Sequence, residues 1–112
     1  MTWATAFLLT QLIEMPLYVL AQRHAAAPRR WAIAFGASAL THPIAWYVFP
    51  LVPRLWGCTA STQCWAEQLI LAEAFAVGVE AVWLREFRIR YAFGWSIGAN
   101  ALSLGLGALI AW

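Results

Sequence analysis

Charge is the scarcest property of this sequence, and two of the four fully charged residue types are missing altogether. Charged residues make up 11% of the 112 residues, as Arg and Glu only, with no Lys and no Asp. Soluble domains usually contain about 25% charged and about 45–50% apolar residues, whereas hydrophobic residues here reach 63%. This balance excludes a soluble globular enzyme and a disordered tail. A net charge of +2 is too small to indicate a nucleic acid or another polyanionic partner.

Cysteine is scarce as well, and no glycine triplet repeat is present. Two cysteines are too few for a disulfide-stapled secreted miniprotein, and the missing repeat excludes a collagen-like fibre. The mean hydropathy of the chain is +0.68. The class of protein that remains is an integral membrane protein.

Four hydrophobic stretches are long enough to cross a bilayer, for which a helix needs roughly 20 mostly apolar residues. They cover residues 3–21, 31–52, 66–84 and 92–112. Their hydrophobic runs are continuous rather than alternating, which predicts helices and not a closed barrel. The first is not expected to be a signal peptide, because no basic segment precedes it and Glu14 interrupts it. We therefore expect an all-α polytopic membrane protein, with a four-transmembrane-helix bundle forming a single domain over residues 1–112.

The arginines predict the orientation of these spans. The middle loop contains only Arg54, and the other six lie in the first and third loops: Arg23, Arg29, Arg30, Arg85, Arg88 and Arg90. Because Arg-rich loops stay in the cytoplasm, the middle loop and both termini are expected outside a bacterial inner membrane. Cys58 and Cys64 lie in that middle loop, where an oxidising exterior favours a disulfide. A redox role is less favoured, because no Cys-x-x-Cys pattern occurs.

The second and fourth spans share a six-residue pattern. Residues 36–41 (GASALT) align with residues 98–103 (GANALS), and four of the six positions are identical. Glu14 of the first span can also be matched with Glu80 of the third. We interpret the chain as two tandem helical hairpins, related by an axis along the membrane normal. The small residues of the shared pattern would let the helices approach closely.

Each span also carries a strongly polar residue near the middle of the membrane. Such residues are costly in lipid and normally face the protein interior. The candidate cation or proton site comprises Glu14, His42, Glu73, Glu80 and Asn100. The supporting polar residues are Gln11, Ser38, Thr41 and Ser103. Glu80 lies nearer the cytoplasmic end and is expected to act as a relay toward it.

Carboxylates combined with one imidazole and one amide suit two kinds of cation. One is a divalent metal ion, for which the candidate ligands are Glu14, His42 and Glu73. The other is a proton passed between the carboxylates. The sequence contains neither Glu-x-x-His nor His-Glu-x-x-His, the helical motifs of metal sites. A further interpretation is that these groups only hydrogen-bond across the bundle and fix the helix register.

Two resemblances accompany these features. The length, the four spans and Glu14 are superficially similar to the small multidrug resistance transporters, although the strong arginine asymmetry departs from the weak charge bias common in that family. Residues 14–16 (EMP), 41–43 (THP) and 100–103 (NALS), together with Glu73 and Glu80, resemble a type of small bacterial four-span membrane protein. This second resemblance implies no particular activity.

The sequence leads to one main functional hypothesis and two alternatives. The main hypothesis is a small inner-membrane protein that binds or relays a cation, either a proton or a metal ion, for transport. Because the bundle is small, we expect a homo-oligomer or a larger membrane complex in the lipid bilayer. The alternatives are a membrane-embedded metalloenzyme acting on lipid or peptide, and a non-catalytic subunit of a membrane complex. A divalent metal ion is the one candidate cofactor.

Overall fold

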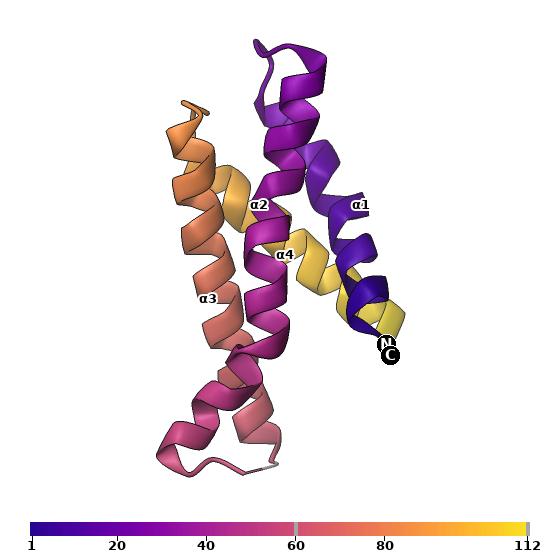
Figure 1. Ribbon diagram of the computed structural model, residues 1–112. Helices are drawn as coiled ribbons and strands as arrows, with labels where there is room; N and C mark the ends of the chain where they lie inside the picture. The colour runs from indigo at the N-terminus through magenta and orange to yellow at the C-terminus, as the bar shows by residue number, and fades with distance from the viewer. Residues whose placement is uncertain (60, 112) are drawn as a thin grey trace.

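Every regular element in the computed structural model is a helix, within the described residues 1–59 and 61–111. The elements are α1 (Trp3–Ala21), α2 (Ala27–Tyr47), the 3-10 helix η1 (Phe49–Trp56), α3 (Thr62–Glu86) and α4 (Ala92–Ala111). Both α1 and α3 pack against α2 and α4, so the four α-helices form a closed ring. Figure 1 shows α2 and α3 side by side, with α4 crossing behind them at a larger tilt.

The second hydrophobic stretch is not one continuous helix. It was expected over residues 31–52, but α2 begins earlier, at Ala27, and ends at Tyr47, where the bent helix η1 follows at 41°. Pro50 and Pro53 explain why the α-helix ends before residue 52, because proline has no amide N–H to continue the α-helical hydrogen-bond pattern. The first and fourth helices begin where they were expected, and residue 112 of the fourth stretch lies outside the described residues.

Within the described part of the chain, two helices are long and apolar enough to cross a membrane, namely α1 and the Ala92–Ile110 portion of α4. A third is added if the bent pair of α2 and η1 counts as one span. Helix α3 is the longest, with 25 residues, but does not belong to this set. Its four glutamates, Glu67, Glu73, Glu80 and Glu86, explain why its hydropathy is lower.

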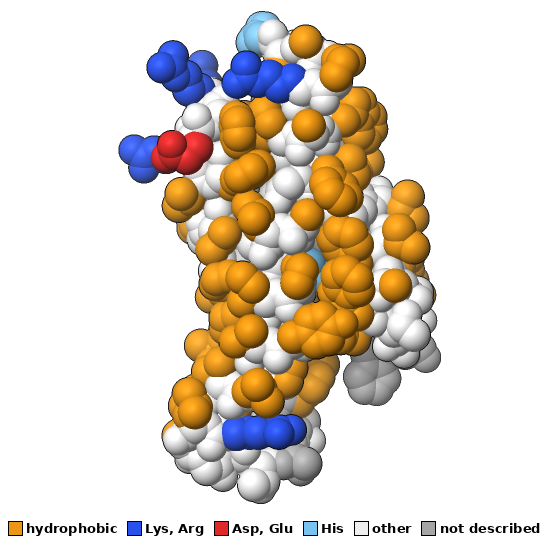
Figure 2. Space-filling view, viewed as in Figure 1, with side chains coloured by type: hydrophobic (Ala, Val, Ile, Leu, Met, Phe, Trp, Pro, Cys, Tyr) orange, Lys and Arg blue, Asp and Glu red, His pale blue; other side chains and the backbone are white. Residues whose placement is uncertain are grey.

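The distribution of side chains is the reverse of that in a soluble domain. Large apolar side chains on the outer faces are strongly exposed, such as Leu12 at 73% and Leu109 at 77%. The buried residues include eight polar ones: Gln11, Glu14, Gln22, Ser38, Thr41, Glu80, Ser96 and Asn100. In Figure 2 apolar side chains cover the middle of the visible face, and basic side chains gather mainly at its upper end. This pattern is typical of a protein whose outer surface contacts lipid and whose interior is polar.

A small apolar core lies between the polar centre and the arginine-rich end. It consists of Tyr18, Ile33, Ala34, Ala37, Leu84 and Ala99. Beside this core, Gly36 allows α2 to approach Trp83 of α3, since a Cβ atom at Gly36 would lie 2.6 Å from Cζ2 of the indole ring. The indole N–H of Trp83 donates a 2.9 Å hydrogen bond to the carbonyl oxygen of Ile33. The close approach and this hydrogen bond together set how α2 packs on α3.

Candidate functional site

Glu80 of α3 accepts hydrogen bonds from all three of the other α-helices. The hydroxyl of Tyr18 in α1 donates to Oε2, and the hydroxyl of Thr41 in α2 donates to Oε1 at 2.6 Å. The amide group of Asn100 in α4 donates to Oε2 at 2.8 Å. Glu80 is only 1% exposed. A single buried carboxylate therefore connects the four α-helices.

Glu14 of α1 is the second buried carboxylate and is also 1% exposed. It accepts a hydrogen bond from the hydroxyl of Ser38 in α2. Ser38 and Thr41 are three residues apart, so they lie on the same side of α2. One face of α2 therefore supplies a hydroxyl donor to each of the two buried glutamates.

Two members of this network were not among the residues selected from the sequence. Tyr18 donates to Glu80 and is fully buried. Ser96 is also fully buried, accepts from the side chain of Asn100 through its carbonyl oxygen at 2.9 Å, and donates its hydroxyl to Val77. A helical signal was available for both, because Tyr18 follows Glu14 by four residues and Ser96 precedes Asn100 by four.

A cavity of about 820 Å³ opens between the helices beside this network, and we call it the acidic cavity. All five predicted site residues line it: Glu14, His42, Glu73, Glu80 and Asn100. Thr41 and Ser103 line it as well, whereas Gln11 and Ser38 do not. No arginine contributes to its walls, which are otherwise mainly apolar. Gln11 instead donates to the carbonyl oxygen of Phe35 at 3.4 Å.

Glu73 and His42 line the acidic cavity but stand apart from the hydrogen-bond network. Glu73 is half-buried and forms no hydrogen bond within the described residues. The imidazole of His42 lies among aromatic rings, with centroid distances of 5.4 Å to Phe7 and 6.2 Å to Trp46. Its Nδ1 atom is buried and has no partner in the described part of the chain. Residues 1–59 and 61–111 contain no group of three or more His, Cys, Asp or Glu side chains placed to hold a metal ion.

The acidic cavity has one end near the chain start and the middle loop. Met1, Pro50 and Trp65 line that end. At the other end Tyr18 contacts Glu80, and the next turn of α1 carries Gln22, which donates to the carbonyl oxygen of Tyr18 at 2.9 Å. The apolar core around Tyr18 therefore separates the acidic cavity from the arginine-rich end.

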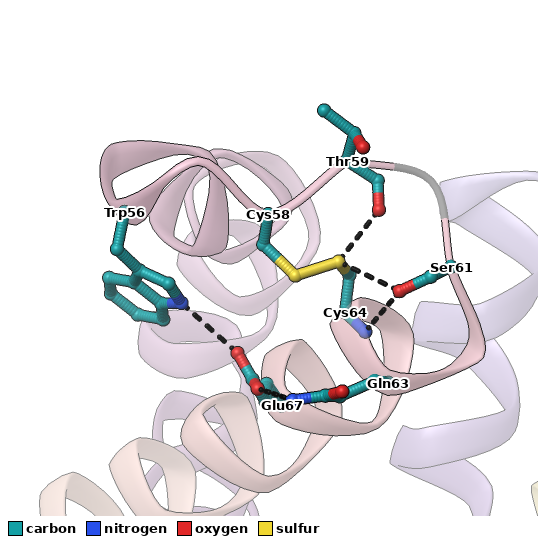
Figure 3. Close-up of a disulfide and its surroundings, with 7 residues drawn as sticks. All are labelled: Trp56, Cys58, Thr59, Ser61, Gln63, Cys64 and Glu67. Carbon is teal, nitrogen blue, oxygen red and sulfur yellow. Dashed lines mark hydrogen bonds between the residues drawn. A yellow bond between two sulfur atoms is a disulfide. The ribbon is translucent and has the colours of Figure 1, made fainter.

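A disulfide closes the loop between η1 and α3, at the same end of the bundle as Pro50 and Trp65 (Figure 3). It joins Cys58 and Cys64, whose Cα atoms are 5.8 Å apart, and links the end of η1 to the first turn of α3. Glu67 belongs to this loop region and not to the cavity, since it accepts from Trp56 at 3.1 Å and from Gln63 at 3.0 Å. The fifth glutamate of the chain, Glu86, is exposed at the last position of α3.

The fold and the site together define a helical protein with candidate membrane spans and an acidic interior. Comparison with known proteins adds no family to this description, because no protein-family model, curated protein or solved structure matches the chain.

Proposed function

We propose that the chain is a four-span inner-membrane protein that takes up protons in the acidic cavity and relays them for transport. The observation that carries this proposal is the composition of one cavity: three glutamates line it, and no arginine does. Two of these glutamates are 1% exposed and contact hydroxyl groups. Carboxyl and hydroxyl groups in contact are the usual components of proton relays in membrane proteins.

Helix α3 is proposed to be the fourth span in spite of its glutamates. Its 25 residues extend about 37 Å at 1.5 Å per residue, which exceeds a hydrocarbon core of about 30 Å. Glu80 faces the interhelical network and Glu73 faces the acidic cavity, so neither needs to contact lipid. Glu67 lies near the loop end. With six of the seven arginines at the opposite end of the bundle, the termini and the disulfide loop are proposed to face outward.

Two tandem hairpins are the proposed origin of this arrangement. In the first hairpin Glu14 of α1 contacts Ser38 of α2, and in the second Glu80 of α3 contacts Asn100 of α4. Ser38 and Asn100 occupy the same position of the repeated six-residue pattern. Each hairpin therefore contributes one acid with a partner from its own second helix, as a duplication would produce.

A proton suits this centre better than a metal ion does. The two oxygens of Glu80 already accept from one hydroxyl each, and Oε2 also accepts from an amide. These three donors occupy most of the roughly four lone-pair positions of a carboxylate, which leaves room for a proton but not for bidentate binding of a metal ion. Glu14, His42 and Glu73, the candidate metal ligands, are not placed together to hold a metal ion within the described residues. Because the apolar core separates the acidic cavity from the cytoplasmic side, relay of a proton to that side requires the helices around Tyr18 to move. A second copy or a larger complex is the proposed setting for that movement.

A proteoliposome assay tests the proposal. Vesicles containing the protein and a trapped pH indicator are given an inside-negative potassium diffusion potential, and the rate of internal acidification is recorded. Glu14→Gln removes one proton-binding group but leaves an oxygen for Ser38. We expect it to reduce proton uptake to the rate of protein-free vesicles.

The matched control is Glu67→Gln, which makes the same chemical change in α3 beside the disulfide loop and should leave uptake unchanged. Circular dichroism of each variant checks that the helices are intact. Uptake by Glu14→Gln at the rate of the unmodified protein would contradict the proposal. Uptake by the unmodified protein at the protein-free rate would also contradict it and would favour a polar network that only fixes helix packing.

A further inference from the structure

A second cavity, of about 650 Å³, lies at the opposite end of the bundle from the disulfide loop, and we call it the basic cavity. It lies between the connection from α1 to α2 and the connection from α3 to α4. Its basic residues come from both connections and from the first turn of α2, and are Arg23, His24, Arg29, Arg88 and Arg90. No glutamate contributes to its walls. Four arginines therefore line one cavity whose walls contain no glutamate.

Gln22 and Arg30 stabilise the connection from α1 to α2 through hydrogen bonds to backbone carbonyl groups. Gln22 donates from its side-chain amide to the carbonyl oxygens of Tyr18 at 2.9 Å and Arg30 at 3.0 Å. Arg30 in turn donates to the carbonyl oxygens of Ala25 and Arg23. Arg30 therefore stabilises the loop and does not line the basic cavity. A structural role accounts for this one arginine but not for the four that face the hollow.

The second connection has an unusual backbone where it forms the wall. Arg88 and Tyr91 both have φ of 58°, the left-handed region that non-glycine residues seldom adopt. Aromatic rings accompany the arginines here, with the guanidinium carbon of Arg29 5.9 Å from the ring centre of Phe87 and that of Arg90 4.9 Å from Tyr91. Such contacts support a guanidinium through its face and leave its N–H groups free for a ligand.

Two helix N-termini add to the positive potential. Helices α2 and α4 both start at this end of the molecule, and neither has an acidic residue in its first turn. Ala26 at the start of α2 provides no side-chain cap for the free amide groups. Unneutralised helix N-termini attract anions. The N-termini of α2 and α4 therefore add to the positive potential that the arginines produce in the basic cavity.

We propose that the basic cavity binds the phosphate group of an anionic phospholipid. Guanidinium groups match the geometry of phosphate oxygens, and basic pockets between helices at the cytoplasmic side of a membrane suit lipid headgroups. The aromatic side chains of Phe87, Tyr91 and Trp95 line the same hollow and offer an apolar contact for the adjoining part of a lipid. This inference rests on the proposed placement of this end of the bundle in the headgroup layer, and it is independent of proton relay.

Native mass spectrometry of the detergent-purified protein tests the inference. Phosphatidylglycerol and phosphatidylcholine are added in separate titrations, and bound lipid is counted. We expect phosphatidylglycerol to bind more tightly, and the double variant Arg29→Ala with Arg88→Ala to lose that preference. The expected loss is about fivefold for each arginine and roughly twenty-five-fold for the pair. Arg54→Ala removes one arginine charge at the other end, as each single substitution does here, and should retain the full preference.

Two further measurements, on a lysine double variant and with a soluble phosphate compound, separate lipid binding from a folding defect and from binding of free phosphate. The double variant with lysine at both positions keeps the charge and guards against a folding defect, and it should bind phosphatidylglycerol more weakly than the unmodified protein because lysine lacks the bidentate fork. Glycerol phosphate, a soluble phosphate monoester without acyl chains, distinguishes a lipid from a free phosphate compound. Binding of glycerol phosphate without any preference for phosphatidylglycerol would overturn the lipid assignment.

An equal affinity for both lipids, or the same loss in Arg54→Ala, would overturn the site itself. Lipid binding that fails while Glu14→Gln still abolishes proton uptake would reject the basic cavity alone. Lipid binding that succeeds without proton uptake would reject the proposed function alone.

Discussion

The close approach of Gly36 to Trp83 makes Gly36→Ala a sharp test of the helix packing. The added methyl group would lie 2.6 Å from Cζ2 and 3.2 Å from Cε2 of the indole ring. The ring cannot move away freely, because its N–H is bonded to Ile33 at 2.9 Å. Overpacking of this kind costs about 1–3 kcal/mol, and a lost hydrogen bond costs about 1 kcal/mol more. Alanine regains about 1 kcal/mol through its helix propensity. We therefore expect the free energy of unfolding to fall by roughly 1–3 kcal/mol.

The repeated pattern supplies the matched control for this change. Gly98 occupies the position equivalent to Gly36, but a Cβ atom there would have nothing within 4 Å. Gly98→Ala should therefore leave the stability unchanged or raise it by up to about 1 kcal/mol. Unfolding of both variants is measured in the same detergent by circular dichroism. Trp83→Ala removes the clashing ring, so in that background Gly36→Ala should cost nothing further. Equal effects of the two glycine substitutions would refute the packing of α2 on α3.

Two further changes test the network and the loop. Tyr18→Phe removes a hydroxyl that donates to buried Glu80, and it should lower the free energy of unfolding by about 1.5–3 kcal/mol; Tyr47→Phe, at an exposed position, should change it by less than about 0.5 kcal/mol. Similar melting of the two variants would contradict the network. Replacing Cys58 and Cys64 by serine opens a loop with a sequence separation of 6, which should cost about 2 kcal/mol. Reductant should lower the melting temperature of the unmodified protein equally and leave the double variant unaffected.

Much of the fold was predictable because hydrophobic length and the helical pattern depend on local sequence. The expected helix starts at residues 3 and 92 agree with α1 and α4. The break of the helix after Tyr47 could also have been predicted from the sequence, since Pro50 lies inside the expected second span and Pro53 directly follows it. Helix α3 begins at Thr62, four residues before the expected start at residue 66. This start depends on Ser61, which caps the helix by accepting a hydrogen bond from the backbone N–H of Cys64 at 3.2 Å.

The hydrogen-bond partners of the buried polar residues could not be predicted from their depth in the membrane alone. Glu73 and Asn100 were both expected near the middle of the membrane and Glu80 nearer the cytoplasmic end, but Asn100 contacts Glu80. Counted from the helix ends, Glu80 lies six residues from Glu86 and Asn100 eight from Ala92, which is about 9 Å and about 12 Å along each helix. The tilt of α4 brings these levels closer together (Figure 1). Tyr18 was missed because an aromatic residue near the end of a span is also common as an interface anchor.

Infrared difference spectroscopy of the purified protein tests most directly whether the carboxyl groups of the acidic cavity exchange protons with the solution. Spectra are recorded through a pH titration, and the carbonyl stretch of protonated carboxylic acids is followed. We predict a band that changes with pH and that loses a component in Glu14→Gln but retains it in Glu67→Gln. A spectrum that does not respond to pH, or an identical response in the two variants, would contradict proton binding at this centre.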